Sequence, residues 1–170
     1  MEKSKRILNQ MVLENDDKAK NWDERFLGIA KQVLTWSSCV RPDRQTGAVI
    51  VKDKRIIATG YNGAPAGIKS CKEKGYCYRK QKGIKSGTCL ELCYANHAEQ
   101  NALMQAAKQG IAVEGATLYT TKRPCINCLK LIINSGIKRI VYATENYNNE
   151  VVDDILNQCD IEICYLPDKK

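Results

Sequence analysis

Three side chains of the types that bind zinc stand in two short motifs, His97-Ala98-Glu99 and Pro124-Cys125-Ile126-Asn127-Cys128. One imidazole and two thiols would fill three corners of a tetrahedral zinc site and leave the fourth for water. The Cys-x-x-Cys spacing lets both sulfurs reach adjacent corners of one metal. The sequence therefore predicts an open, catalytic zinc site that is formed by His97, Cys125 and Cys128.

Glu99 fits this arrangement as a proton carrier and not as a ligand. Two thiolates nearly neutralise Zn²⁺, so the metal polarises water less than it would with three histidines. A carboxylate beside the water is then needed to complete its deprotonation. We expect Glu99 to take that proton, hand it to a ring nitrogen of a nucleobase and deliver another to the departing amine.

Each motif has a simpler interpretation when it is taken alone. His97 is the only histidine of the chain, and a lone histidine is most often structural. Cys125 and Cys128 would also suit a thioredoxin-like redox pair. Zinc is favoured because both motifs are predicted at helix starts, where the helix dipole lowers the pKa of a thiol. Pro124 agrees with that placement, since its fixed φ suits the first turn of a helix.

Hydrophobic periodicity places the motifs in an alternating series of elements. Alternation of this kind predicts an α/β fold, a three-layer α-β-α sandwich with a mixed five-stranded sheet. We treat residues 1–170 as a single domain with an N-terminal arm or helix over 1–21 and a cysteine-rich insert over 64–94. Helices are predicted over 22–36, 97–109, 125–134 and 153–159, and strands over 46–51, 55–60, 116–121, 139–143 and 161–166.

Composition indicates the class of protein and the cellular compartment in which we expect this chemistry. The chain is 44% hydrophobic and 27% charged, as in ordinary globular proteins. It has no apolar run that could cross a membrane and no apolar secretory signal near Met1, so we expect a cytoplasmic location. A reducing cytosol favours metal sites or free thiols over disulfides for the nine cysteines. The net charge of +8 favours binding of anionic molecules, but the basic residues are scattered along the sequence. Charge alone therefore does not identify a partner.

The motifs resemble those of the zinc-dependent cytidine and deoxycytidylate deaminase superfamily, and most closely those of the deoxycytidylate (dCMP) deaminases. The His/Glu and Cys/Cys pattern is specific for the superfamily, and the resemblance extends over about residues 22–147. Four stretches carry the closer match: Ser38-Cys39-Val40-Arg41 leading into Gly47-Ala48-Val49-Ile50, Gly60-Tyr61-Asn62-Gly63-Ala64-Pro65, His97-Ala98-Glu99-Gln100-Asn101-Ala102, and Thr117-Leu118-Tyr119.

The resemblance implies a cytidine deaminase-like fold that hydrolyses deoxycytidylate to deoxyuridylate and ammonia. It also implies that Asn62 hydrogen-bonds the sugar, that the Ala98 backbone N–H contacts the base carbonyl, and that Tyr147 lies near the phosphate. Asn62 could instead be a turn residue, because Asn-Gly is a strong turn signal. Residues 43–46 look longer than the basic run usual before Gly-Ala-Val in the family and differ from it, which argues against an anion-binding role there. Some related enzymes form oligomers and respond to deoxynucleoside triphosphates, which makes a homo-oligomer and such an effector expected here.

The insert is too poor in apolar residues to be held by burial alone. The resemblance implies a second, structural zinc in this region, as in some dCMP deaminases, and four thiolates would make a closed site. We favour Cys39, Cys71, Cys77 and Cys93. The alternatives are a local set in which Cys89 replaces Cys39, and a group of free thiols.

The motifs leave the substrate open among relatives that share the metal and the glutamate. These relatives act on free cytidine, a tRNA adenine, guanine or a riboflavin precursor. A nucleic-acid substrate is disfavoured, because only 6% of the residues are aromatic and no basic or aromatic track is visible. The alternative from another class is a zinc-bearing binding module without turnover, in which Glu99 would be dispensable.

Overall fold

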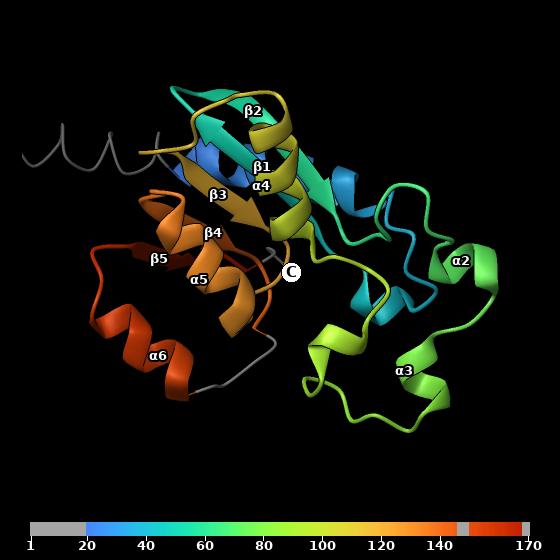
Figure 1. The fold of residues 1–170 in the computed structure, drawn as a ribbon. Coiled ribbons are helices and arrows are strands. Elements are labelled where there is room, and N and C mark those ends of the chain that lie inside the picture. The colour runs from blue at the N-terminus through green and yellow to red at the C-terminus, as the bar shows by residue number, and fades with distance from the viewer. Residues whose placement is uncertain (1–19, 146–149, 168–170) are drawn as a thin grey trace, which may run out of the picture.

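Five strands form one mixed sheet in the computed structural model, which describes residues 20–145 and 150–167 (Figure 1). The predicted hairpin is formed by β1 (Gly47–Lys52) and β2 (Arg55–Tyr61). The other strands are β3 (Thr117–Thr120), β4 (Arg139–Tyr142) and β5 (Glu162–Tyr165). Their order is β2-β1-β3-β4-β5, with β1 antiparallel to β2 and β3 and the last three strands parallel. The mixed five-stranded sheet is therefore confirmed.

Helices cover both faces of this sheet (Figure 1). Residues 20–34 are helical and pack on one face, and α4 (Ala98–Lys108), α5 (Ile126–Asn134) and α6 (Glu150–Asn157) pack on the other. The parallel half of the sheet requires crossovers, which α5 and α6 supply. The predicted three-layer sandwich is thus confirmed. No helix in the described residues is long and apolar enough to cross a bilayer.

Side chains of the central strands alternate between two cores, because neighbouring residues of a strand point to opposite faces. In β1, Val49 packs with Phe26 and Val33 of the helix over 20–34, whereas Ile50 packs against the opposite layer. Val49 and Ile50 are both fully buried. The sheet therefore makes apolar contacts on both of its faces.

Glycine brings α4 unusually close to the sheet. A Cβ on Gly60 of β2 would lie 2.1 Å from the carbonyl oxygen of Ala98 and 2.4 Å from the backbone nitrogen of Ala102. Only a residue without a side chain fits there, because backbone atoms cannot rotate away. This contact fixes the first turn of α4 over β2.

The insert differs from this framework. Its three short helical segments are α2 (Cys71–Lys74), α3 (Tyr78–Gln81) and η2 (Leu90–Leu92), where the sequence predicted no regular structure. Its ends are joined by a β-bridge between Gly63 and Asn96. A further short helix, η1 (Pro42–Arg44), precedes β1. Most of the predicted arm over 1–21 lies outside the described residues.

Candidate active site

The predicted zinc ligands lie at the starts of two adjacent helices. His97 is the N-cap of α4, Cys125 is the N-cap of α5, and Cys128 lies in the first turn of α5. The backbone N–H of His97 donates to Oε1 of Gln100 at 2.8 Å, which fixes the entry of the chain into α4. Pro124 precedes the N-cap of α5 instead of occupying its first turn. The placement at helix starts is otherwise as predicted.

The three side chains converge on one point. Nδ1 of His97 lies 3.4 Å from Sγ of Cys125 and 3.3 Å from Sγ of Cys128. A tetrahedral zinc with ordinary Zn–N and Zn–S bonds would separate such atoms by about 3.6 Å. Among the residues that the structure describes, this is the only set of three or more potential ligands whose donor atoms all lie within 4.8 Å of one another. The donor set and its spacing fit zinc.

The two thiols differ in their tendency to ionise. The hydrogen bond from Cys128 and the neighbouring imidazole of His97 lower the pKa of Cys125 to about 4, although burial opposes this. The same hydrogen bond, together with burial, raises the pKa of Cys128. The hydrogen bond to Cys125 raises the pKa of His97. One thiolate is thus available without metal, and a cation would be needed to remove the second proton.

Glu99 lies beside this cluster in the first turn of α4, with its side chain buried at 4% exposure. Its Oε2 is 3.5 Å from Sγ of Cys128, and its Oε1 accepts a hydrogen bond from the hydroxyl of Thr120 at 3.2 Å. Burial raises the pKa of the carboxyl. Because the carboxyl is contacted on two sides and its pKa is raised, Glu99 is suited both to accept and to donate a proton.

His97 and Cys125 line a pocket that is also lined by cationic residues. Ala98 and Glu99 line the pocket beside the ligands, and the cationic residues come from three separate segments. Arg79 comes from α3 of the insert, and its charge acts on His97. Burial and the charge of Arg44 lower the pKa of Lys122. The cationic lining consists of Arg41, Arg44, Arg79, Lys122 and Arg123.

Asn62 also lines the pocket, and its amide is engaged in the loop before β1. Its Oδ1 accepts from the backbone N–H of Thr46 at 2.8 Å and from the hydroxyl of Ser37 at 2.7 Å. Its Nδ2 donates to the carbonyl oxygen of Arg44 at 2.9 Å. Asn62 therefore holds this loop, a role that neither sequence interpretation included. Tyr147 lies outside the described residues.

Cys39 lies near the thiols of the insert, but no three of these sulfurs lie within 4.8 Å of one another in the part of the chain that the structure describes. Burial raises the pKa of Cys39, and nearby Cys93 and Cys77 raise it further. Burial likewise raises the pKa of Cys71 to about 11, with contributions from the same neighbours and from Cys39. The backbone N–H of Lys72 donates to the carbonyl of Ser38 at 3.1 Å, which links α2 to the residue before Cys39. Cys89 is exposed.

The sequence analysis missed Thr120 and all five cationic residues of the pocket lining, among them Arg79. Thr120 is a buried residue at the end of β3, and a threonine in a strand carries no signal that separates a carboxylate partner from a core position. Arg79 lies in the aperiodic insert, where spacing gives no orientation. Only the position of Thr120 shortly before the Pro-Cys motif could have suggested its proximity to the metal ligands.

Comparisons with known proteins agree with this geometry. Residues 20–144 match the family described as cytidine and deoxycytidylate deaminase zinc-binding region. Deoxycytidylate deaminase from Mycobacterium phage D29 is 44% identical over 131 residues, covering 74% of this chain and 97% of the relative. The corresponding protein of Enterobacteria phage T4 is 37% identical over 173 residues, covering 84% and 89% of the two chains.

A solved structure gives the same result. The dCMP deaminase of cyanophage S-TIM5, crystallised with dCMP and dUMP, superposes with a TM-score of 0.68 at 30% identity. The match covers 84% of this chain and 95% of that one. Because the family match spans most of the chain and includes all three converging ligands and Glu99, the chain belongs to the cytidine and deoxycytidylate deaminase family.

Proposed function

We propose that this protein is a zinc-dependent dCMP deaminase, which hydrolyses deoxycytidylate to deoxyuridylate and ammonia. The observation that carries the proposal is the convergence of His97, Cys125 and Cys128 beside the buried carboxyl of Glu99. The names of the relatives from phages D29 and T4 and the nucleotides bound by the cyanophage enzyme support this substrate.

The roles of the residues follow from their positions. Zinc held by the imidazole and the two thiolates would supply a polarised water. Glu99 takes a proton from the attacking water, passes it to the ring nitrogen and delivers a proton to the leaving amine. Thr120 orients the carboxyl through its hydroxyl. The N–H of Ala98 is a free donor in the first turn of α4 and would contact the base carbonyl.

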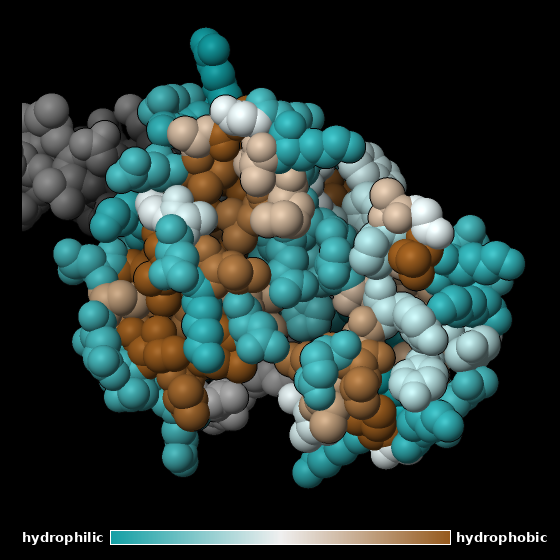
Figure 2. All heavy atoms as spheres, viewed as in Figure 1, coloured by the Kyte–Doolittle hydropathy of each residue, from teal (hydrophilic) through white to brown (hydrophobic). Residues whose placement is uncertain are grey.

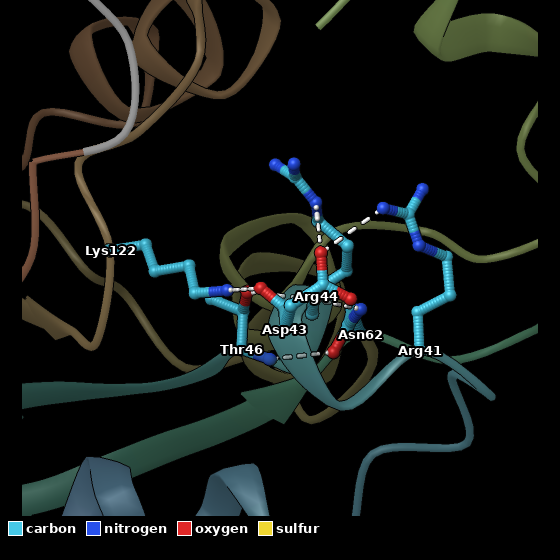
Figure 3. Close-up of polar contacts among 6 residues, drawn as sticks. All are labelled: Arg41, Asp43, Arg44, Thr46, Asn62 and Lys122. Atoms are coloured by element: carbon cyan, nitrogen blue, oxygen red, sulfur yellow. Dashed lines mark hydrogen bonds and ion pairs between the residues drawn. The ribbon is translucent and has the colours of Figure 1, made fainter. Parts of the chain in front are cut away.

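The charge of the pocket favours a nucleotide over a nucleoside. Five cationic side chains line it, and Glu99 is the only acidic side chain that does so among the described residues. Arg123 is paired with Asp153 and Glu145, whereas Arg41 and Arg44 share the single carboxylate of Asp43 (Figure 3). A substrate with a phosphate matches this field, whereas cytidine does not. Asn62 would hydrogen-bond the sugar through the second N–H of its amide, and Tyr147 would lie near the phosphate.

Glu99→Gln tests the mechanism directly. The variant keeps the shape of the site but cannot carry the proton, so we expect it to retain zinc and lose deamination. Ammonia release from dCMP, cytidine, deoxycytidine triphosphate and adenosine-containing tRNA would identify the substrate. Turnover in the variant would exclude the proton-carrier role. Zinc without turnover of any substrate by the natural protein would favour a binding module.

We also propose a second, structural zinc held by Cys39, Cys71, Cys77 and Cys93. The neighbouring thiols raise the pKa of Cys39 and of Cys71, and both of these cysteines are buried, which supports this set. Metal analysis should give two zinc ions per chain, falling to one in Cys77→Ser and remaining at two in Cys89→Ser. One zinc in the natural protein would leave these cysteines as free thiols. Loss of a zinc in the Cys89 variant would favour the local set.

Homo-oligomer formation is a further part of the proposal. Met104 on α4 and Leu131 on α5 are 58% and 43% exposed beside a shallow apolar groove, and Figure 2 shows apolar side chains gathered on the face of α4, α5 and α6. Exposed apolar patches of this kind mark interaction sites. Sedimentation should give a species larger than the monomer that Met104→Glu reduces. Titration with deoxycytidine triphosphate tests the predicted effector, and the cytoplasmic location remains a prediction.

A further inference from the structure

The insert joins two tyrosine rings and two lysines in one continuous surface cluster. Nζ of Lys74 lies 3.2 Å from the centroid of the Tyr94 ring, and this ring meets that of Tyr78 edge to face at a centroid distance of 5.8 Å. Nζ of Lys82 lies 5.8 Å from the centroid of the Tyr78 ring. The four residues come from α2, from α3 and its C-terminal end, and from the segment after η2. We call them the tyrosine–lysine cluster.

The charge of the insert is strongly positive. Residues 64–94 contain seven cationic side chains and only two acidic ones. One acid is already engaged, since Oε2 of Glu73 accepts a hydrogen bond from the backbone N–H of Ser70 at 2.7 Å. Arg79 lines the active-site pocket, and its Nη2 donates to the carbonyl of Lys85 at 3.1 Å.

The remaining cations of the insert are lysines without acidic partners. Within the described residues, none of their ammonium groups forms an ion pair with a carboxylate. Figure 2 shows hydrophilic side chains along the edge of the molecule that α2 and α3 form. The lysines are Lys69, Lys72, Lys74, Lys80, Lys82 and Lys85.

We propose that this surface binds single-stranded nucleic acid, with the lysines contacting phosphates and the tyrosine rings stacking on bases. A positively charged surface that also presents aromatic rings is the combination with which proteins hold single strands without reading their sequence. An acidic protein surface would satisfy the lysines but would leave the rings without a partner. The inference goes beyond the proposed function and does not depend on it.

The rings of the insert are accessible to a base. Tyr94 and the neighbouring Tyr76 are 38% and 37% exposed. A lysine over an exposed ring is held weakly, because water competes for its ammonium group. Lys74 can therefore move from the ring of Tyr94 to a phosphate, and the face that it leaves is then open to a base.

Backbone contacts hold the segments that carry the cluster. The N–H of Lys82 donates to the carbonyl of Tyr78 at 3.0 Å, which closes α3. Asn96, two residues after Tyr94, forms the β-bridge with Gly63 that ties the end of the insert to the end of β2. The cluster is therefore formed before binding, and a strand requires side-chain rotation and no folding of the insert.

The tyrosine–lysine cluster lies outside the active-site pocket. In the described part of the chain, Cys77 and Cys93 line that pocket, whereas the residues that follow them, Tyr78 and Tyr94, do not. A strand on this surface is thus a docking partner and not a substrate, so the expectation of a free nucleotide as substrate is unaffected. The sequence analysis saw no aromatic track, because the contacts of the cluster exist only in the folded insert.

The test measures binding to the zinc-loaded, full-length protein by fluorescence anisotropy. The first probe is a labelled oligothymidylate of about twelve nucleotides, within the size that single-strand-binding surfaces cover. The second probe is an abasic deoxyribose-phosphate chain of the same length, which keeps the phosphates and lacks the bases. We expect the oligothymidylate to bind roughly tenfold more tightly than the abasic chain. Both affinities should fall as salt increases.

Paired variants separate charge from stacking. Lys74→Gln/Lys82→Gln removes two phosphate contacts, so the slope of log affinity against log salt should become shallower by about 1.4. Tyr78→Leu/Tyr94→Leu should weaken binding of the oligothymidylate roughly tenfold and leave binding of the abasic chain unchanged. Tyr78→Phe/Tyr94→Phe keeps the rings and should bind both probes as the natural protein does.

Matched controls remove the same residue types outside the insert. Lys54→Gln/Lys138→Gln removes two exposed lysines, and Tyr165→Leu removes a tyrosine that is 49% exposed and packs on Tyr142. Neither control should change binding. Zinc content and far-UV circular dichroism check that every variant is folded, and none of these readouts depends on turnover of dCMP.

Three results would overturn the proposal. Equal affinity for the abasic chain and the oligothymidylate would remove the stacking role of the tyrosines. Displacement of the oligothymidylate by polyglutamate at equal total charge would make an acidic protein the partner instead. Undetectable binding at low salt, or equal losses in the insert variants and their controls, would exclude this surface as a binding site.

Discussion

The protein gathers cysteines in two places and supports them in different ways. Cys125 and Cys128 stand at the start of α5, whose other face is buried against the sheet by Leu129 and Ile132. Cys71 and Cys77 stand at the starts of α2 and α3, each only four residues long, in an insert with few apolar contacts. The first pair is positioned by the core, and the second by local hydrogen bonds.

This difference predicts how each region responds to the loss of a bound metal. A ligand on a packed helix keeps its position when the metal leaves, because burial of the helix does not depend on the metal. Thiols on short helices have no such support, so a metal would contribute to the folding of the insert itself. The cluster of His97, Cys125 and Cys128 is thus preformed, and the insert is predicted to depend on zinc.

The largest effect should come from removing a ligand of the preformed cluster. Cys128→Ser replaces a thiolate with a poor zinc ligand, so we expect loss of the catalytic zinc and a decrease in kcat/KM of roughly a thousandfold or more. The fold should persist, since β3, α4 and α5 are held by apolar packing. Metal content, activity and far-UV circular dichroism check this result.

Cys159→Ser is the control for this variant, because Cys159 follows α6 outside both clusters. It should leave metal content and activity unchanged. Global unfolding of Cys128→Ser would mean that the catalytic cluster also depends on metal, and the contrast between the two regions would disappear.

Paired glycine substitutions compare the supports directly. Gly60→Ala would push a methyl group into the backbone of α4, and we expect it to lower the free energy of unfolding by about 3 kcal/mol. It should also lower kcat by about a hundredfold, because His97 and Glu99 move with the helix. Urea denaturation and steady-state kinetics measure both effects.

Gly75→Ala is the counterpart in the insert. Gly75 has a φ of +73° at the end of α2 and open space around the missing Cβ, so its substitution costs about 1 kcal/mol of local strain. Catalysis should stay within about twofold of the natural protein. Equal losses of activity in the two glycine variants would show that the insert and α4 position the site equally.

Removal of the Thr120 hydroxyl should have an intermediate effect. Thr120→Val keeps the volume but leaves Oε1 of Glu99 without its donor, and we expect kcat to fall about tenfold with zinc retained. Because the hydroxyl stabilises the ionised carboxylate, its loss raises the pKa of Glu99 and moves the acidic limb of the rate profile to higher pH. Thr120→Ser keeps the hydroxyl and should restore both values. An unchanged profile in the valine variant would assign Thr120 a packing role only.

Sequence and structure agree most closely where chemistry and periodicity coincide. His97, Cys125 and Cys128 could be placed at helix starts because the apolar pattern that follows each motif is strong. The strands were found within one or two residues, since their apolar runs are bounded by glycine and charged turns. The convergence of these three side chains was therefore predictable from the sequence, and their catalytic role stays a prediction.

In regions without hydrophobic periodicity, far fewer of the contacts could be predicted from the sequence. The pairing of Asp43 with Arg41 and Arg44 depends on a short helix at Pro42, and alternating charges in a loop do not reveal which side chains meet. Arg79 reaches the pocket only through the folded insert. Asn62 was interpreted as a sugar contact or a turn residue, but its hydrogen bonds to Thr46 and Arg44 depend on the tertiary fold.

The smallest predicted effect tests the local support of the insert. The hydroxyl of Ser70 accepts from the backbone N–H of Glu73 at 3.2 Å, and the Ser70 N–H donates to Oε2 of Glu73 at 2.7 Å. Ser70→Ala removes the first of these contacts and should cost about 1 kcal/mol, which corresponds to a roughly fivefold weaker affinity for the proposed second zinc. Competition with a chelator measures this affinity, and Ser70→Thr should preserve it. Catalysis should hardly change, because α4 and α5 do not rest on α2. A larger loss of catalytic zinc than of insert zinc in Ser70→Ala would reverse the contrast, because it would make the core-supported cluster dependent on the cap of a four-residue helix.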